Sequence, residues 1–183
     1  MFIGLISDTH GVFADDVRNF LSPVDRIWHA GDFGTLQCAH DIAAFKPLVG
    51  VYGNCDGLDV RQEYPAFQNF ECEGLRVLMT HIGLRRGSYW AYNPHQPMYD
   101  LRAKALIDSY HPDIFVCGHT HIPQVFHDKR EDFLFMNPGA CGFQGSCDVP
   151  RMALRFQIES GKITGLEKCE LPSAALVKVD TEG

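Results

Sequence analysis

The sequence lacks a long apolar run, a basic tract and closely spaced cysteine pairs. No stretch is long and apolar enough to span a bilayer, so we expect no membrane partner. The first apolar run, Phe2–Ile6, is too short for a secretory h-region and follows no basic segment, so we interpret it as a strand. The seven cysteines include no C-x-x-C pair, which fits a reducing compartment better than a disulfide framework. These absences together predict a cytoplasmic protein.

A surplus of positive charge is also missing. The formal net charge is -7 and the pI is near 5.6, which argues against binding long nucleic acid. If the substrate carries phosphate, cations other than Lys and Arg must neutralise it. At 183 residues and 45% hydrophobic content, the chain fits one globular domain covering residues 1–183.

The hydrophobic pattern changes along the chain from strands that alternate with helices to hairpins. The first strands are expected at Phe2–Ile6, Arg26–Ala30 and Leu48–Tyr52, with helices over Ala14–Leu21 and from the N-cap Thr35 to Phe45. The next elements are expected to be a hairpin of Phe67–Cys72 with Leu75–Thr80, a helix over Asp100–Tyr110 and a strand over Ile114–Cys117. Two further hairpins are expected, one of Gln124–His127 with Phe133–Met136 and one of Arg151–Ile158 with Lys162–Leu171. Gly83–Met98 lacks a clear period and contains two prolines, which indicates a loop.

Polar side chains directly follow five of the apolar runs. They are Asp8 with His10, Asp32, Asn54, His81, and His119 with His121. If the first three strands are parallel and joined by right-handed crossovers, we expect these ends to meet at one sheet edge, where open α/β sheets bind ligands. Two carboxylates, one amide and four imidazoles are unfavourable as isolated buried groups but suit metal ions. Mixed oxygen and imidazole ligands favour Mn, Fe or Zn over Ca, and seven ligands predict two ions that share a carboxylate.

The same residues lie in five short blocks. The blocks are Ser7-Asp8-Thr9-His10, Gly31-Asp32, Gly53-Asn54-Cys55-Asp56, Thr80-His81 and Gly118-His119-Thr120-His121. In this order they resemble the signature blocks of the calcineurin-like metallophosphoesterases. The short chain, the Gly-Asn-Cys-Asp form and the turn Asn137-Pro138-Gly139 most resemble the small bacterial and archaeal phosphodiesterases related to the retromer scaffold subunit.

This resemblance implies an α/β fold, a four-layer α/β/β/α sandwich. It implies a first ion held by Asp8, His10, Asp32 and His121, and a second held by Asp32, Asn54, His81 and His119, with Asp32 bridging. Asn54, Asp32 and His119 are the predicted catalytic residues. Mn is the expected metal, with Fe, Zn and Ni as alternatives.

The implied activity is hydrolysis of a small phosphate ester by a hydroxide that bridges the two ions, while the Asn54 amide donates to the phosphate. Two features depart from the family pattern. Cys55 stands where many relatives have a His that protonates the leaving group, and losing such an acid costs roughly two to four orders of magnitude on poor leaving groups. We therefore expect a preference for aryl esters, unless His95 supplies the proton. The second departure is Ile82-Gly83, where relatives often have Gly-His.

Several assignments stay open. Arg85 and Arg86, with His95, are candidates for binding the substrate, although paired surface arginines are more often solvated. The aromatic residues of the same loop, Tyr89, Trp90 and Tyr92, could stack on a substrate or form a subunit contact, so a homo-oligomer is an alternative to a monomer. Functionally, the alternative to the enzyme is a scaffold that kept the fold without catalysis. The presence of all seven ligand residues favours the enzyme.

Overall fold

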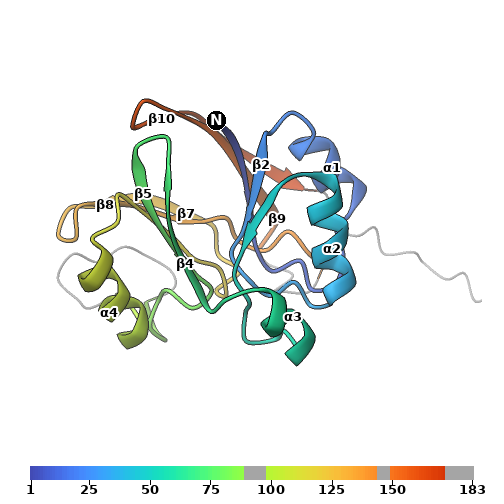
Figure 1. Cartoon of the computed structure of the whole chain (residues 1–183), viewed down its shortest axis with the longest axis horizontal. Coiled ribbons are helices and arrows are strands. Elements are labelled where there is room, and N and C mark those ends of the chain that lie inside the picture. The colour runs from blue at the N-terminus through green and yellow to red at the C-terminus, as the bar shows by residue number, and fades with distance from the viewer. Residues whose placement is uncertain (89–97, 144–148, 172–183) are drawn as a thin grey trace, which may run out of the picture.

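The computed structural model describes residues 1–88, 98–143 and 149–171, and two five-stranded sheets dominate it (Figure 1). The first sheet has the order β10-β9-β1-β2-β3. Its parallel part comprises β1 (Phe2–Ile6), β2 (Arg26–His29) and β3 (Leu48–Gly50). The hairpin of β9 (Arg151–Glu159) and β10 (Lys162–Leu171) extends it, with β9 antiparallel to β1.

The second sheet has the order β4-β5-β6-β8-β7. Its centre is parallel: β6 (Ile114–Val116) pairs with both β5 (Leu75–Thr80) and β8 (Phe133–Asn137). The outer strands β4 (Phe67–Cys72) and β7 (Gln124–Asp128) are antiparallel to their neighbours. The strands that lead into His81 and His119 are therefore parallel neighbours, so both residues follow the carboxyl ends of their strands.

Helices cover the outer faces of both sheets, which gives four layers (Figure 1). On the first sheet lie α1 (Asp15–Leu21) and α2 (Leu36–Phe45), whose buried residues pack in one cluster with those of β1 and β2. The short helix α3 (Leu58–Glu63) contributes Val60 to that cluster, and α4 (Leu101–Tyr110) covers the second sheet. Side-chain caps begin two helices: Thr35 accepts from the Cys38 N–H and Asp100 from the Arg102 N–H.

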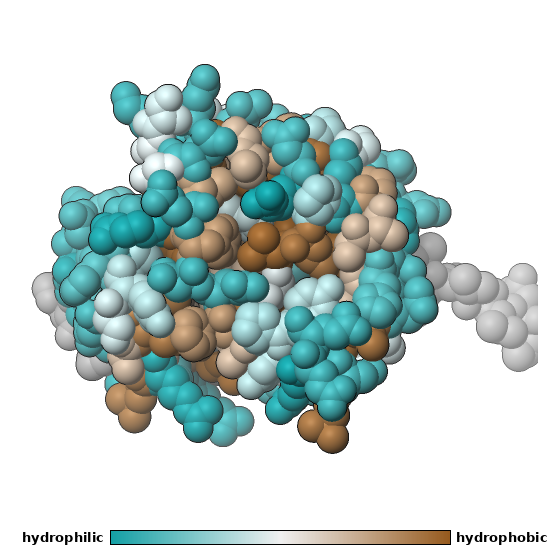
Figure 2. Space-filling view, viewed as in Figure 1, coloured by the Kyte–Doolittle hydropathy of each residue, from teal (hydrophilic) through white to brown (hydrophobic). Residues whose placement is uncertain are grey.

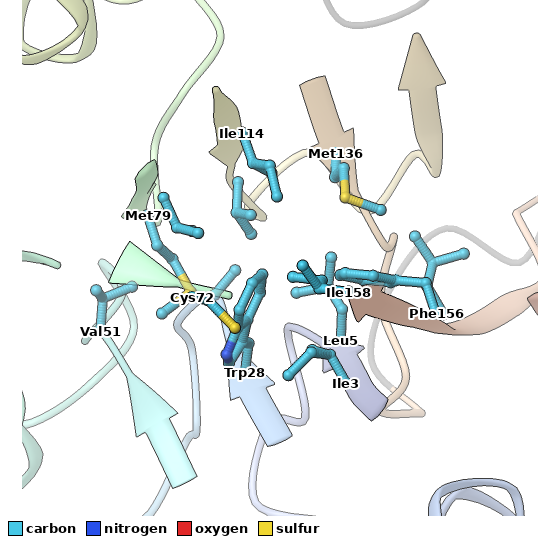
Figure 3. Close-up of a cluster of buried hydrophobic side chains, with 14 residues drawn as sticks. Ile3, Leu5, Trp28, Val51, Cys72, Met79, Ile114, Met136, Phe156 and Ile158 are labelled. Atoms are coloured by element: carbon cyan, nitrogen blue, oxygen red, sulfur yellow. The ribbon is translucent and has the colours of Figure 1, made fainter. Parts of the chain in front are cut away.

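Alternation along the strands builds the core between the sheets. Ile114 and Val116 of β6 face the first sheet, whereas Phe115 between them faces α4. Figure 3 shows the inner side chains of the two sheets directed at one another, among them Ile3, Leu5 and Trp28 from the first sheet and Met79, Ile114 and Met136 from the second. This packing fixes the relative position of the two sheets and hence of their loops.

The α/β/β/α architecture and the predicted hairpins are confirmed, but three details differ from expectation. The third strand ends at Gly50 because the Tyr52 N–H donates to Pro65 O, outside the sheet. Helix α3 was not predicted, and the polar clusters come from the ends of two sheets rather than one edge of a single sheet. Residues 89–97 of the expected loop Gly83–Met98 lie outside the described residues. At the ends of this segment, Leu84 and Tyr99 form an isolated antiparallel β-bridge. Within the described residues, no helix combines the length and apolar character needed to cross a membrane.

Candidate metal centre

The loops after β1 and β2 bring Asp8, His10 and Asp32 together. They run side by side, since the Asp8 N–H donates to Gly31 O at 2.9 Å and the His10 N–H donates to Asp32 O at 3.1 Å. Asp8 and Asp32 are buried. The parallel pairing of β1 with β2 thus places both predicted carboxylate ligands at one point.

Five of the seven predicted ligands have a left-handed backbone. Their φ angles lie between 47° and 70°, in Asp8, His10, Asp32, His119 and His121. This conformation costs roughly 1–2 kcal/mol for an L-residue, although Asp and His tolerate it better than bulky residues do. Such strain at the predicted ligands supports a functional role for these loops.

Asp8 is the most enclosed carboxylate. Its Oδ2 accepts from the Ser7 hydroxyl at 2.6 Å and from the His119 N–H at 3.1 Å. Its Oδ1 lies 3.1 Å from His121 Nε2 and 3.9 Å from His10 Nε2, yet has no hydrogen-bond donor of suitable geometry among the described residues. One oxygen therefore anchors the side chain, while the other faces a group of imidazole nitrogens.

His81, at the end of β5, completes the buried side of the centre. Its Nδ1 donates to Ala30 O at 2.7 Å, so in the neutral ring Nε2 carries a lone pair. That nitrogen is buried without a hydrogen-bond partner and lies 3.3 Å from Asp32 Oδ2. The ring also packs on Gly31, where an added Cβ would lie 2.5 Å from Nδ1. A side chain at that position would displace the ring.

The loop after β6 directs two histidines to different neighbours. His121 approaches His10, with 3.2 Å between their Nε2 atoms, and the His119 ring lies edge-on to His81 with centroids 5.3 Å apart. The resemblance assigned His121 and His119 to different ions, and that division stays a prediction.

The pKa shifts show that the centre attracts positive charge. Burial opposes ionisation of Asp8 and Asp32, but hydrogen bonds and nearby imidazoles outweigh it, so both pKa values fall below the ordinary range. Burial also opposes protonation of His81, yet the nearby carboxylates of Asp32 and Asp8 raise its pKa. The pKa of His121 is raised by the adjacent Asp8 carboxylate, whereas burial and His81 lower that of His119.

These side chains fit a cation. Three groups of potential ligand atoms lie within 4.8 Å of one another: Asp8 with His10 and His121, Asp8 with Asp32 and His81, and His10 with Asp32 and Cys55. In the neutral ring of His81 the lone pair of Nε2 lies near two carboxylate oxygens, Asp32 Oδ2 and Asp8 Oδ1, which is unfavourable unless a proton or metal ion lies between them. Carboxylate and imidazole ligands suit Mn, Fe, Zn and Ni.

Asn54 and Cys55 lie on the exposed rim. The Cys55 N–H donates to Asp32 Oδ1 at 2.8 Å, and the Asn54 amide donates to Cys55 Sγ at 3.2 Å. Gly53 permits this close approach, since a Cβ there would lie 2.0 Å from Asp32 Oδ1. Asp56 has the expected orienting position, since its carboxylate accepts from the Gly34 and Gly53 N–H groups at 2.7 Å.

The sequence interpretation missed two groups next to the candidate centre. Cys55 was considered only as a replaced acid, but its sulfur lies within 4.8 Å of a potential ligand atom of His10 and of Asp32. The Ala30 carbonyl, which orients His81, has no side-chain signal in the sequence. Cys117 is buried as expected, and His29 is a buried residue paired with Thr9 Oγ1 at 3.0 Å.

The predicted substrate contacts are less well defined. Arg85 and Arg86 are exposed, and among the described residues neither side chain forms a hydrogen bond to the centre. His95, Tyr89, Trp90 and Tyr92 lie outside those residues. Their proposed roles remain predictions from the sequence.

Comparison with known proteins identifies the class. Residues 1–161 match the family model of the calcineurin-like phosphoesterase superfamily domain, and the chain belongs to this superfamily. It is 31% identical over 167 residues to a "Probable metallophosphoesterase" of Methanothermobacter thermautotrophicus, covering 87% of this chain and 88% of the relative.

Solved structures agree on the fold. A "Novel Archaeal Phosphodiesterase" superposes with a TM-score of 0.66 at 22% identity, covering 93% of this chain and 100% of the other. Wild-type Vps29 from Entamoeba histolytica, complexed with Zn²⁺, gives a TM-score of 0.61 at 17% identity, with coverages of 93% and 99%. At these identities the similarity shows the fold of the chain.

Proposed function

We propose that the protein is a phosphodiesterase that hydrolyses small phosphate esters with two divalent or transition-metal ions. Mn is the metal that we expect at both positions. The proposed ligands are Asp8, His10, Asp32 and His121 for one ion, and Asp32, Asn54, His81 and His119 for the other. The observation that carries the proposal is the pair of buried acceptors without partners, Asp8 Oδ1 and His81 Nε2, which face a shared space. The names of the curated relative and of the archaeal structure support the same class of reaction.

When bound, two such ions neutralise phosphate charge and activate a water molecule for attack on phosphorus. The chain fixes their shared ligand, because Asp32 Oδ1 is held by the Cys55 N–H while Oδ2 faces His81. The Asn54 side chain is exposed and its amide N–H donates to the Cys55 sulfur. The same N–H can instead donate to a phosphate oxygen of the substrate. His119 has a lowered pKa and is therefore neutral near pH 7, as a metal ligand or a donor to substrate requires.

Cys55 limits the leaving groups that the enzyme can expel. Burial and the neighbouring Asp32 raise the pKa of its thiol to about 11, so the proton is held too tightly for efficient transfer near neutral pH. Aryl esters, whose leaving groups need little protonation, are therefore the proposed preferred substrates.

The direct experiment combines metal analysis with turnover. Protein purified without chelator should contain divalent metal and hydrolyse an aryl phosphodiester; Mn²⁺ should raise the rate, and removal of metal by a chelator should abolish it. The same protein after chelation and re-addition of Mn²⁺ is the matched control. No bound metal and no Mn-dependent turnover would contradict the proposal and favour the scaffold alternative.

A further inference from the structure

A groove opens directly from the exposed side of the candidate metal centre. It has a volume of about 710 Å³, and Asn54 and His81, both proposed metal ligands, are part of its lining. From there it extends between α3, the start of β4 and one side of α4. Volumes between roughly 300 and 1,000 Å³ are typical of sites for organic molecules of drug size.

One wall of the groove is preformed. The Arg61 side chain donates to Asp56 O at 2.8 Å and to Asn54 O at 3.1 Å, and its guanidinium lies over the Tyr52 ring, 4.9 Å from the centroid. The same residue thus ties the turn that carries Asn54 to an aromatic wall. A wall held in this way needs little reordering when a ligand binds.

The rest of the lining is largely apolar with a polar rim. Phe67, Ala105 and Leu106 line the groove from β4 and α4, and Asp100 and Arg102 lie at the start of α4. In Figure 2, hydrophobic surface lies in the middle of the face where β4 runs in Figure 1, surrounded by hydrophilic residues. Aromatic and aliphatic walls beside a phosphate site suit a ligand whose organic part is flat and apolar.

We propose that this groove binds the organic substituent of the phosphate ester, an aromatic group larger than a single ring, while the phosphoryl group lies at Asn54 and His81. The inference rests on the proposed function, and it makes Tyr52, Phe67 and Leu106 determinants of specificity. A phosphate with only small alkyl substituents would leave these walls in contact with water. The enzyme therefore selects aromatic esters by binding, in addition to the selection of leaving groups at Cys55.

The test compares two non-hydrolysable ligands with the same anionic group, naphthylphosphonate and methylphosphonate. Dissociation constants are measured by calorimetry on the full chain with Mn²⁺ and after chelation. Wild-type protein should bind naphthylphosphonate at least about tenfold more tightly, because only this ligand buries apolar surface in the groove.

Two substitutions fill the groove from α4, Ala105→Trp and Ser109→Trp. Both positions are exposed, so the fold should tolerate them, which circular dichroism checks. Each substitution should raise the dissociation constant of naphthylphosphonate about tenfold and change that of methylphosphonate by no more than about twofold. Ala43→Trp, at an exposed position of α2 on the other sheet, is the matched control and should change neither constant.

The outcomes separate the two proposals. Mn-dependent binding of both phosphonates with equal affinity would overturn the groove and leave the proposed function standing. A naphthyl preference that survives both substitutions would place the aromatic group elsewhere and also overturn the groove. Absence of Mn-dependent binding for either ligand would overturn the proposed function, and the inference with it.

Discussion

The loops of the two sheets contribute different chemistry to the same point. Those of the first sheet supply both buried carboxylates, Asp8 and Asp32, together with one imidazole, His10, and the exposed amide of Asn54. Those of the second sheet supply only imidazoles, His81, His119 and His121. The oxygen atoms and most of the imidazole nitrogens of the candidate centre thus come from different sheets.

The difference shows why this centre depends on the tertiary fold. The two halves hold each other in place, since His81 Nδ1 donates to Ala30 O and the His119 N–H donates to Asp8 Oδ2. Neither sheet alone would bring a complete ligand set together. Packing of the sheets therefore positions the carboxylates and imidazoles before any ion binds.

The largest effect is expected from removing the carboxylate that the two halves share. Asp32→Asn should lower kcat/KM for an aryl phosphodiester by roughly a thousandfold or more, because both ions lose a charged ligand. The amide has nearly the same shape, so circular dichroism should show an intact fold. Asp132→Asn, whose side chain is 92% exposed, is the control and should be as active as wild type. Normal activity of Asp32→Asn would exclude its bridging role.

A smaller loss is expected on the second-sheet side. His121→Ala removes a ligand of one ion only and should lower kcat/KM roughly a hundredfold, with partial recovery at high Mn²⁺ concentration. His127→Ala, an exposed histidine of β7, is the matched control and should have no effect. If both variants behave alike in metal titrations, the proposed assignment of His121 is wrong.

A second imidazole on the first-sheet side, next to His10, would reduce the difference between the two sheets. Cys55→His should supply the missing acid and speed hydrolysis of alkyl esters by roughly ten- to a hundredfold, with little change for nitrophenyl esters. The measurement is the dependence of kcat on leaving-group pKa. An equal change for both ester classes would contradict the account of the missing acid.

The imidazole side should also impose a pH dependence on metal binding. The raised pKa values of His81 and His121 mean that their protonated rings, next to the carboxylates of Asp8 and Asp32, stabilise the metal-free protein below the ordinary imidazole pKa of about 6.5. This contribution is lost as the pH rises through the raised pKa values. The affinity for metal changes with pH in the opposite direction: it rises with pH, because metal binding needs neutral imidazoles. Mn²⁺ affinity should therefore fall by about tenfold per pH unit for each proton displaced, between pH 8 and 6. Calorimetry that finds a constant affinity over this range would contradict the proposed ligand set.

The smallest effect is expected outside both halves. Arg85→Ala should change kcat/KM by no more than about twofold, because the side chain is exposed and solvated arginines contribute little. Steady-state kinetics on the aryl phosphodiester measures it. A loss of tenfold or more would instead make Arg85 part of the substrate site.

The sequence was sufficient to predict that Asp8 and Asp32 lie close together. Asp8 and Asp32 could be identified because each follows a short apolar run, and parallel strands end at the same edge. The strain at these residues could not be predicted, because it depends on hydrogen bonds between loops distant in sequence. Helix α3 was missed because its six residues follow Gly57 without a side-chain cap and are too few to show a period.

The groove was equally invisible in the sequence. Tyr52 and Arg61 belong to no recognisable sequence motif. In the structure the backbone leaves β3 before Tyr52, whose N–H donates to Pro65 O, and the Arg61 guanidinium lies over the Tyr52 ring. The proximity of Cys55 to His10 is likewise a tertiary property. Both features depend on packing between segments that no local pattern links.

The most direct test is anomalous diffraction from crystals grown with Mn²⁺. We predict two peaks roughly 3.5–4 Å apart, one on each side of the Asp32 carboxylate, with Asp8 beside one and His81 beside the other. A map with no peak at Asp32, from protein shown to be folded and saturated with Mn²⁺, would contradict the two-metal centre.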